Sequence, residues 1–433
     1  MVVGAGIAGL VAARQLGLAG WDVELLEKSS GSRPDGYMMD FFGPGVEASE
    51  RIGLYPRLAA VAYHVEAAEY VDATGRPTSS LDYDRFARLA GGKVLSLLRP
   101  DMERAALAAL DDVAPGRVLV RYGAQVSRVW TDGDGVRVAV GDPPGGTLDA
   151  DVLVGADGIH SAVRARVFGP EEEFLRRLGM RAAAFIVTEP LLNARFRNRF
   201  VLTDSIDRAA GLYSLRSDKV AAFMVYRDAA GATGYFPSGS PRERLRGEFA
   251  GLGEGIDRVL ELCPEHPYDD VVAQIIMPGW QKGRTVLVGD ACGAVSLLAG
   301  QGGSLAIAGA ALLGDVLAPV ASPEGISSAL AEFERRWRPV VEEAKAAGRR
   351  TASSFLPETG HSGSCAGGSF GPPICLESTG WWPARSWAGS QSKPRPTSAR
   401  VPVPFPSCRC LYRRHVRFGG WKRTDSVRRQ VDA

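Results

Sequence analysis

The chain has 433 residues, of which 45% are hydrophobic and 23% charged, as is typical of a folded globular protein rather than a disordered or fibrous one. The length allows two or three domains with a large core. The formal net charge of +2 favours no class of charged partner, and no apolar run reaches the roughly 18 residues of a membrane span, so we expect neither nucleic acid nor a membrane as partner.

Residues 2–27 form the stretch around which the chain is organised. A buried Val-Val strand leads into GAGIAG, an apolar helix follows, and a second strand ends at Glu27. This order predicts a dinucleotide-binding unit, in which Gly4 permits the tight turn, Gly6 lets a pyrophosphate approach the backbone and Gly9 lets the helix pack against the strand. The helix N-terminus attracts phosphate, and Glu27 is placed to accept hydrogen bonds from a ribose.

The segment 28–40 is rich in Gly, Ser and Pro and predicts a loop. In it, Arg33 is either part of a solvated turn or an anion contact in a loop that crosses the cofactor, and the sequence leaves both open. We expect amphipathic helices at 46–58 and 102–111. Arg99, just before the second helix, is either a surface charge or a clamp on the cofactor.

Three segments at 118–120, 125–130 and 136–140 predict an antiparallel meander that covers one face of the main sheet. A short buried strand at 152–154 then leads into a sharp turn with Asp157. Between 180 and 226 four predicted antiparallel strands, with a hairpin turn at Ser-Asp, form a separate sheet that faces the substrate. Aromatic residues on these strands are more often core than catalytic, so we assign no catalytic residue.

The sequence then again shows the pattern of the first segment, a buried strand that ends at an acid. A buried strand ends at Asp290, and a small-residue loop leads into a helix at 304–317 that is so rich in Ala and Gly that another backbone or a flat ligand must lie against it. A charged helix at 326–350 is expected to break at Pro339.

The remaining segment, 353–433, holds 12 Lys or Arg against 4 Asp or Glu and many Pro and Gly, so we expect a basic, disordered tail. Two neighbouring cysteines in it lack a second pair, so we expect no metal site. The body of the chain contains only Cys263 and Cys292, which favours a reducing, cytoplasmic setting.

Three motifs in this order are more specific than any one alone: GAGIAG with its acid, then GADGIHSAVR, then GRTVLVGDA with AGQGG. Together they resemble the flavoprotein aromatic hydroxylases, the single-component FAD-dependent monooxygenases related to para-hydroxybenzoate hydroxylase. The stretches RPDGYMMDFFGPG and LLRPDMERAAL are similar to the branch that includes the tetracycline-degrading monooxygenases. The resemblance covers about residues 1–350.

The resemblance implies an α/β fold, with a Rossmann-like FAD-binding domain that has a βαβ start and a β-meander. It is interleaved with a mixed or antiparallel-sheet substrate domain, and a disordered C-terminal tail follows. The expected limits are 1–165 for the FAD-binding domain (with helices and strands inserted at 60–110), 166–278 for the substrate domain, 279–352 for the return to the FAD-binding domain with the C-terminal helices, and 353–433 for the tail.

The resemblance also implies bound FAD, with NADPH or NADH as co-substrate. Its site residues carry over to this sequence as the ADP-binding set Gly4, Gly6, Gly9 and Glu27, the flavin contacts Asp40 and Arg99, Arg33 near the approach of the nicotinamide cofactor, Asp157 linked to both cofactors, Asp290 at the ribityl chain, and Gly300, Gly302 and Gly303 under the isoalloxazine.

The implied reaction uses NAD(P)H and O2 to hydroxylate an aromatic or polyketide-like small molecule through a flavin C4a-hydroperoxide. Epoxidation, halogenation and dehydrogenation are alternatives on the same scaffold. A truncated flavin-binding protein without turnover is another, because only three residues precede Gly4 and the first strand is expected to begin upstream. Relatives often have His at the position of Gly293 and a Pro pair at Ser296 and Leu297, so we expect this chain to differ in the geometry beside C4a.

Overall fold

The computed structural model describes residues 1–31, 36–132, 135–141, 145–228, 239–353 and 355–356. All of these belong to one compact unit, which extends from Met1 to Trp381. A second unit, Trp382–Ala433, and most of the predicted tail at 353–433 lie outside the described residues.

A six-stranded sheet carries all three motifs. Its strands follow the order β17-β18-β11-β1-β2-β7, and all are parallel except β17 at one edge. Because parallel strands end at the same edge, the turns after β1, β11 and β18 lie close together. The strands are β1 Val2–Val3, β2 Val23–Leu26, β7 Val118–Arg121, β11 Leu153–Gly155, β17 Gln281–Lys282 and β18 Thr285–Leu287.

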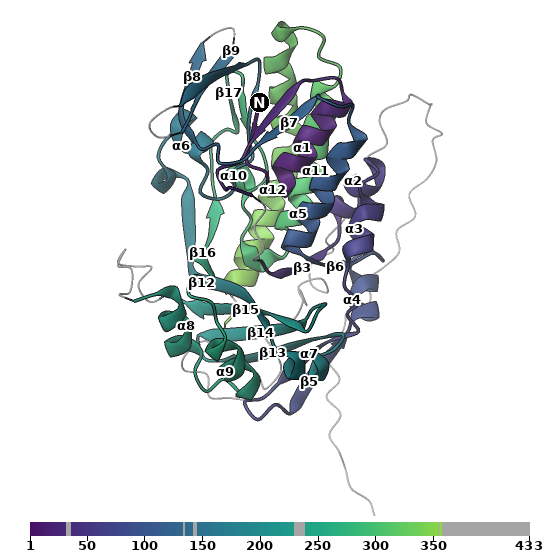
Figure 1. Cartoon of the computed structure of the whole chain (residues 1–433), viewed down its shortest axis with the longest axis vertical. Coiled ribbons are helices and arrows are strands. Elements are labelled where there is room, and N and C mark those ends of the chain that lie inside the picture. The colour runs from purple at the N-terminus through teal and green to yellow at the C-terminus, as the bar shows by residue number, and fades with distance from the viewer. Residues whose placement is uncertain (32–35, 133–134, 142–144, 229–238, 354, 357–433) are drawn as a thin grey trace, which may run out of the picture. The chain divides into compact units, whose positions relative to one another are not determined.

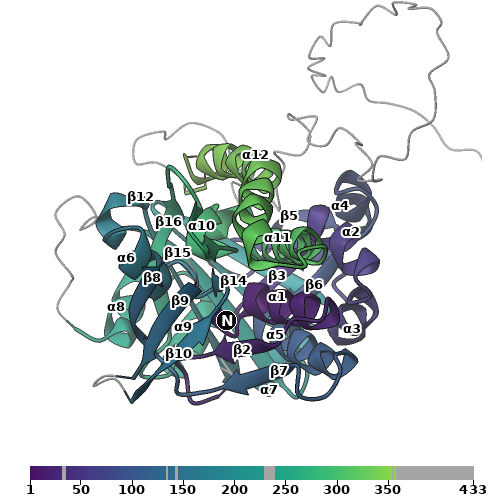
Figure 2. The same cartoon turned by 90° about the horizontal axis from the view of Figure 1, so that it is seen from above.

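Helices α1 (Ile7–Leu18), α11 (Gly302–Leu317) and α12 (Ile326–Ser353) pack side by side on one face of this sheet (Figure 2). The small residues of α11 allow this close packing. A Cβ at Gly309 would lie 2.5 Å from Trp337 Nε1, and one at Gly314 would lie 2.5 Å from Gln15 Cβ. The composition of this helix predicted that another backbone or a flat ligand lies against it. In the structure α12 and α1 lie against α11 at these two glycines.

The predicted break at Pro339 is wrong, because α12 continues through it. An interior proline removes one helix hydrogen bond and costs about 3 kcal/mol. The helix tolerates this loss because its buried side chains on both sides, including Phe333, Trp337 and Val341, belong to the main core.

The predicted meander is wrong in its first strand. Residues Val118–Arg121 form β7, which pairs in parallel with β2 in the main sheet. The three-stranded antiparallel sheet consists instead of β8 (Val126–Asp132), β9 (Gly135–Val140) and β10 (Gly146–Ala150). It covers the face of the main sheet opposite α1 and α11 (Figure 2).

A seven-stranded sheet has the order β16-β12-β15-β14-β13-β4-β5. The predicted substrate-facing strands are all in it, and the hairpin turn at Ser217 and Asp218 is confirmed by their positive φ angles of 60° and 57°. The segment 67–82, expected as part of an insertion in the first domain, adds β4 and β5 through parallel pairing of β4 with β13. The strands are β4 Ala67–Val71, β5 Pro77–Asp82, β12 Leu175–Thr188, β13 Arg199–Ser205, β14 Arg208–Ser214, β15 Lys219–Arg227 and β16 Tyr268–Ile275.

The two faces of the seven-stranded sheet have different neighbours (Figure 1). Helices α7 (Pro190–Arg195), α8 (Pro241–Phe249) and α9 (Glu254–Glu261) cover one face and enclose a separate apolar core. The other face is turned towards a short two-stranded antiparallel sheet of β3 (Met38–Phe41) and β6 (Leu95–Leu98). The mixed and antiparallel architecture confirms the expected fold class, while the exact domain limits remain a prediction.

The expected helix at 46–58 is two helices, because Gly53 turns the chain with a φ of 72°. They are α2 (Pro44–Arg51), which packs on α11, and α3 (Tyr55–Val61). The expected helix at 102–111 begins earlier, as α5. The other helices in the described part of the chain are α4 Tyr83–Leu89, α5 Arg99–Ala108, α6 Ala162–Val167 and α10 Asp290–Gly293, besides short 3₁₀ turns.

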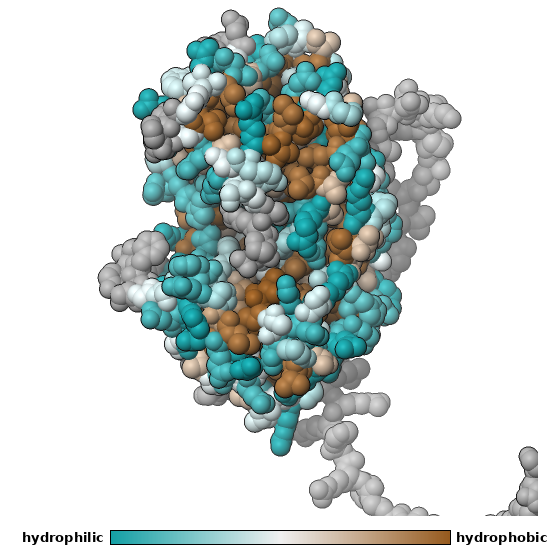
Figure 3. Space-filling view, in the orientation of Figure 1, coloured by the Kyte–Doolittle hydropathy of each residue, from teal (hydrophilic) through white to brown (hydrophobic). Residues whose placement is uncertain are grey.

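The surface view shows apolar side chains near α1 and β7 (Figure 3). Leu18 of α1 and Leu119 of β7 are each about half exposed. Strand β7 is the outer strand of the main sheet, and an ion pair from Arg121 to Glu24 crosses from it to β2. Charged side chains on an outer strand disfavour pairing with another chain. No helix among the described residues is long and apolar enough to cross a membrane.

His160 connects the second motif to the seven-stranded sheet. Its Nε2 lies 3.0 Å from Asp270 Oδ2 on β16, and its Nδ1 lies 2.9 Å from Glu171 Oε1. The hydrogen bond with Asp270 and then that with Glu171 raise the pKa of His160 to about 9. The imidazolium is therefore the form that holds these two parts of the fold together.

We call the hydrogen bonds of His160 with Asp270 and Glu171 the His160 clamp, and they predict that the stability of the fold depends on pH. A folded pKa above the unfolded value of about 6.5 stabilises the fold fully below pH 6.5, and the contribution disappears as the pH rises towards 9. We expect Tm to fall between pH 6.5 and 9.5 in the wild type and to fall less in His160→Gln, as measured by thermal unfolding. His64→Gln, which removes an exposed histidine 3.5 Å from Glu66, is the control and keeps the wild-type slope. An equal slope in all three proteins would contradict the clamp.

Candidate active site

The turn between β1 and α1 has the geometry that GAGIAG predicts. Gly4 has a φ of 101°, and a Cβ there would lie 2.6 Å from Ala156 O; a Cβ at Gly9 would lie only 1.8 Å from Gly4 O. At Gly6, in contrast, the nearest atom to a Cβ would be Glu103 Oε1 at 3.9 Å. Gly4 and Gly9 are thus required by backbone packing, whereas the backbone at Gly6 is open to a ligand.

Helix α1 begins at this open position without a side-chain cap and without an acid in its first turn. Its N-terminal N–H groups and partial positive charge are therefore available to an anion. Glu27 follows β2 beside it, accepting hydrogen bonds from the backbone N–H of Ala5 at 2.8 Å and of Ser29 at 2.9 Å. The predicted ribose contacts of Glu27 remain a prediction.

Asp157 ends the turn after β11 and organises the start of α6. Its carboxylate accepts hydrogen bonds from Ser161 Oγ at 2.5 Å and from the N–H of Val163 at 3.1 Å. Burial nevertheless raises the pKa of Asp157, against the effect of these bonds. Its predicted link to both cofactors remains a prediction, and its contacts in the structure are with its own motif.

Arg164, in the same motif, is fully buried and joins the second motif to the third. Its guanidinium donates to Ala291 O at 2.9 Å, to Ile159 O at 2.6 Å and to Glu171 Oε2 at 2.9 Å. Since Ala291 directly follows Asp290, Arg164 fixes the position of the turn after β18.

Asp290 stands at the carboxyl end of β18 and at the start of α10. Its side chain is accessible to solvent, yet desolvation by the surrounding protein raises its pKa, while Arg99 lowers it. A carboxyl that is both accessible and desolvated lies in a recess. Gly289, with a φ of 59°, brings this turn against α1, where its Cβ would lie 2.8 Å from that of Ala8.

The glycine-rich loop reaches the same recess. Gly300 adopts the left-handed conformation with a φ of 65°, and a Cβ at Gly302 would lie 3.8 Å from Asp290 Oδ1. A Cβ at Gly303 would lie 2.7 Å from Met39 Sδ on β3. Helix α11 begins here without a side-chain cap, so a second helix N-terminus is directed at this place.

Ser304 attaches the start of α11 to the loop after β3. Its hydroxyl donates to Phe42 O at 2.6 Å and accepts from the N–H of Gly45 at 2.8 Å. The close contact has no room for a side chain at Gly45, where a Cβ would lie 2.5 Å from Ser304 Cα. The loop after β3 and the start of α11 are therefore held in a fixed position relative to each other.

Arg99, the first residue of α5, gathers polar and aromatic groups around the recess. Its Nε lies 3.3 Å from Glu103 Oε1, and its guanidinium lies 5.9 Å from the ring centroid of Tyr37. Tyr37 in turn contacts Tyr268 of the seven-stranded sheet, with ring centroids 6.1 Å apart. Burial raises the pKa of both tyrosines, so both are neutral phenols at pH 7.

Asp40 belongs to a different cluster. Its carboxylate on β3 accepts hydrogen bonds from Ser96 Oγ at 2.7 Å and from Tyr83 Oη at 3.1 Å, while burial raises its pKa. Its predicted flavin contact remains a prediction. The other predicted contact, Arg33, lies outside the described residues.

The backbone differs from the family pattern at the two positions, Gly293 and Ser296, where the sequence departs from it. A Cβ at Gly293 would lie 3.0 Å from Val341 Cγ1 of α12, so a histidine would not fit there without displacing that helix. Ser296 has a φ of 93°, which proline, fixed near −65°, does not adopt. The backbone before the glycine-rich loop therefore differs from one that begins with a Pro pair.

Together these features fit FAD. The open backbone at Gly6 and the uncapped N-terminus of α1 suit a pyrophosphate, the uncapped N-terminus of α11 suits a flavin ring, and the accessible carboxyl of Asp290 suits a hydroxylated chain. Four contributors escaped sequence reasoning: Tyr37, Glu103, Arg164 and Tyr268. Tyr37, Glu103 and Arg164 lie within the stretches RPDGYMMDFFGPG, LLRPDMERAAL and GADGIHSAVR, so of these four Tyr268 alone had no motif to signal it before the fold was known.

Comparison with known proteins identifies the family to which the chain belongs. Residues 1–225 and 270–347 match the family model described as FAD binding domain. An uncharacterized protein of Mycobacterium tuberculosis is 35% identical over 72% of this chain and 83% of its own length. A flavin-dependent monooxygenase from an unknown prokaryotic organism is 28% identical over 83% of this chain and 90% of its own length. The crystal structure of tetracycline destructase Tet(51) superposes with a TM-score of 0.71 at 26% identity, over 83% of this chain and 91% of that one.

The backbone contact at Gly9 predicts the effect of a single methyl group. Gly9→Ala forces a Cβ against Gly4 O, so we expect a loss of about 1–3 kcal/mol in the free energy of unfolding and a loss of bound flavin. Denaturant unfolding and the ratio of flavin to protein absorbance measure both. Gly247→Ala, where a Cβ meets nothing within 4 Å in α8, is the control and is neutral or stabilising by up to about 1 kcal/mol. A Gly9→Ala protein that retains flavin would refute the packing argument.

Arg164 gives a second prediction. Arg164→Met leaves two carbonyl oxygens, one of them buried, without their donor. We expect a loss of about 3 kcal/mol in the free energy of unfolding together with weaker flavin binding, because the turn after β18 loses its anchor. Arg166→Met, on the same helix but exposed, is the matched control and changes stability by less than about 0.5 kcal/mol. Equal flavin affinity in the two variants would exclude an anchoring role.

Proposed function

We propose a function from one premise: the chain belongs to the FAD binding domain family and is an FAD-dependent monooxygenase. The specific proposal is that it uses NADPH or NADH and O2 to hydroxylate an aromatic or polyketide-like small molecule. The observation that carries this proposal is the meeting of the flavin motifs, at the ends of β1, β11 and β18, with an aromatic face of the seven-stranded sheet.

The protein contributes placement and electrostatics. Bound FAD would supply electron transfer from the nicotinamide cofactor and the activation of O2. The N-terminus of α1 would hold the pyrophosphate, and the dipole of α11 would favour negative charge on the flavin ring. Gly302 and Gly303 let a flat ring lie on backbone, and Asp290 accepts hydrogen bonds from hydroxyl groups of the connecting chain.

The substrate side is aromatic and shielded. Tyr37 contacts both Tyr268 and Phe223, the latter with ring centroids 5.8 Å apart, and Phe200 stacks on Tyr213 at 3.7 Å on the same face of the sheet. Such a wall suits a planar ring or fused-ring molecule and excludes water from the reacting atoms. The similarity to a tetracycline destructase supports a polyketide-like substrate.

A reducing compartment is part of the proposal. Cys263 and Cys292 are both buried and free, and burial raises the pKa of the Cys263 thiol to about 11. Thiols of this kind remain protonated and need no oxidising environment. We therefore propose a cytoplasmic location.

Turnover is the direct test. Purified protein is expected to be yellow and to oxidise NADPH or NADH faster when phenolic or tetracycline-like compounds are added. Mass spectrometry is expected to find one oxygen atom from O2 in the product. Loss of hydrogen alone would indicate a dehydrogenase, and an epoxide would indicate an epoxidase. A yellow protein whose NAD(P)H oxidation no compound stimulates would favour flavin binding without turnover.

A further inference from the structure

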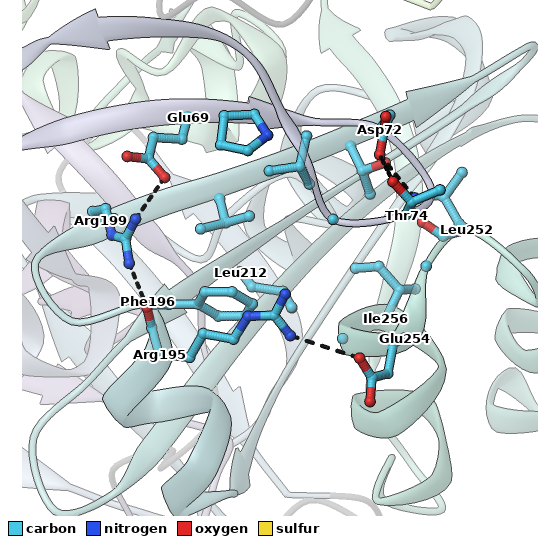
Figure 4. A pocket seen from close by; sticks show the side chains of 17 residues that line it. Glu69, Asp72, Thr74, Arg195, Phe196, Arg199, Leu212, Leu252, Glu254 and Ile256 are labelled. Atoms are coloured by element: carbon cyan, nitrogen blue, oxygen red, sulfur yellow. Dashed lines mark hydrogen bonds and ion pairs between the residues drawn. The ribbon is translucent and has the colours of Figure 1, made fainter.

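A pocket of about 110 Å³ lies on the helix-covered face of the seven-stranded sheet (Figure 4), and none of its lining residues belongs to the three flavin motifs. The loop between β4 and β5, strands β13 and β14, and helices α7 and α9 surround it. Val201 and Leu212 line it, whereas their neighbours Phe200 and Tyr213 stack on the opposite face. Because side chains alternate along strands, the pocket and the aromatic wall are on different sides of one sheet.

The floor of the pocket is apolar and built into the second core. Six of its lining side chains are apolar, and five of them are almost fully buried. An interior normally fills such spaces, and an apolar cavity of about 150 Å³ is known to admit benzene. This pocket is smaller than that cavity but is open at its rim, so one small ring is the largest group that its floor can take. The apolar lining residues are Val71, Phe196, Val201, Leu212, Leu252 and Ile256.

The acids at the rim are already engaged. Glu69 accepts a hydrogen bond from Arg199 at 2.8 Å, and Asp72 Oδ1 accepts from Thr74 and Arg76 in the loop between β4 and β5. Arg199 uses its other terminal nitrogen for the carbonyl oxygen of Arg195, at 2.5 Å. These charges hold the walls of the pocket together and leave little for a ligand.

Arg195 is different. Its half-exposed guanidinium lies 5.6 Å from the ring centroid of Phe196, at the boundary between rim and floor. Its charged partner among the described residues is Glu254 at 3.7 Å, a side chain that is 90% exposed (Figure 4). An ion pair this long and this exposed is weak, so another carboxylate can replace Glu254 without large cost.

We propose that this pocket is a second small-molecule site that binds a single-ring aromatic carboxylate of the size of benzoate. The ring occupies the apolar floor, and the carboxylate forms a bidentate pair with Arg195 in place of Glu254. Planar recognition of this kind is what a guanidinium offers and an ammonium does not. The site is independent of the flavin and of its reaction.

Calorimetry with benzoate on the FAD-loaded protein tests this site. We expect saturable binding in the millimolar range or tighter, without a change in the visible flavin spectrum. Arg195→Gln is expected to weaken binding about tenfold, because it removes a charge-assisted pair. Glu254→Gln is expected to strengthen it about threefold, because it removes the competing carboxylate. Arg197→Gln, a neighbouring exposed arginine outside the pocket, leaves it unchanged.

Gly255→Ala tests the cavity itself. Its Cβ would lie 3.4 Å from Phe196 Cζ and 3.5 Å from Leu212 Cδ1, which are ordinary contacts, and alanine favours the helix α9. This variant therefore folds, and we expect it to bind benzoate more weakly. Absence of saturable binding, equal affinity in Arg195→Gln and wild type, or tighter binding of benzylamine than of benzoate would overturn the proposal. A shifted flavin spectrum that follows benzoate binding would also overturn it, because the ring would then occupy the flavin site.

Discussion

The close approach of three backbone turns at the start of α1 is the constraint on which the rest of the structure depends. Gly4 lies against Ala156 and Gly9, and Gly289 lies against Ala8. A Cβ at Gly4 would push against the turn after β11, and a Cβ at Gly289 would push the turn after β18 away from α1. These turns are far apart in sequence, and they meet at one edge of the sheet because Gly4 and Gly289 have no side chain at the contacts with Ala156 and Ala8.

The electrostatics of the site follow from this arrangement. Two helices, α1 and α11, begin at the same edge without side-chain caps, so each presents the positive end of its dipole to a different part of the proposed site. Asp290 and Arg99 face this place from different elements, and Arg164 holds the turn of Asp290 from behind. A charged, flat cofactor thus meets prearranged dipoles and needs little reorganisation of the protein.

The seven-stranded sheet gives the molecule two chemically distinct sides. On β13 and β14, residues facing the flavin-binding part are aromatic and stacked, whereas the alternating residues facing α7 and α9 are aliphatic and line a small pocket. His160 and Asp270 connect the sheet to the second motif. Neighbouring residues on these strands therefore face the two different sides of the sheet.

The sequence by itself determined the flavin-binding unit, because GAGIAG, Asp157 and Asp290 follow short buried strands whose ends must meet in a parallel sheet. It also predicted the separate sheet and the close packing of the Gly-rich helix, both from periodicity and composition. Tertiary structure alone decided where β4, β5 and β7 pair, since the same alternating pattern fits either sheet, and it kept α12 continuous at Pro339 through core packing. Tertiary structure alone also brought Tyr268 to Tyr37 and Arg195 to its pocket. Each of these contacts joins separate elements, and the distance between two elements along the sequence does not predict that they meet.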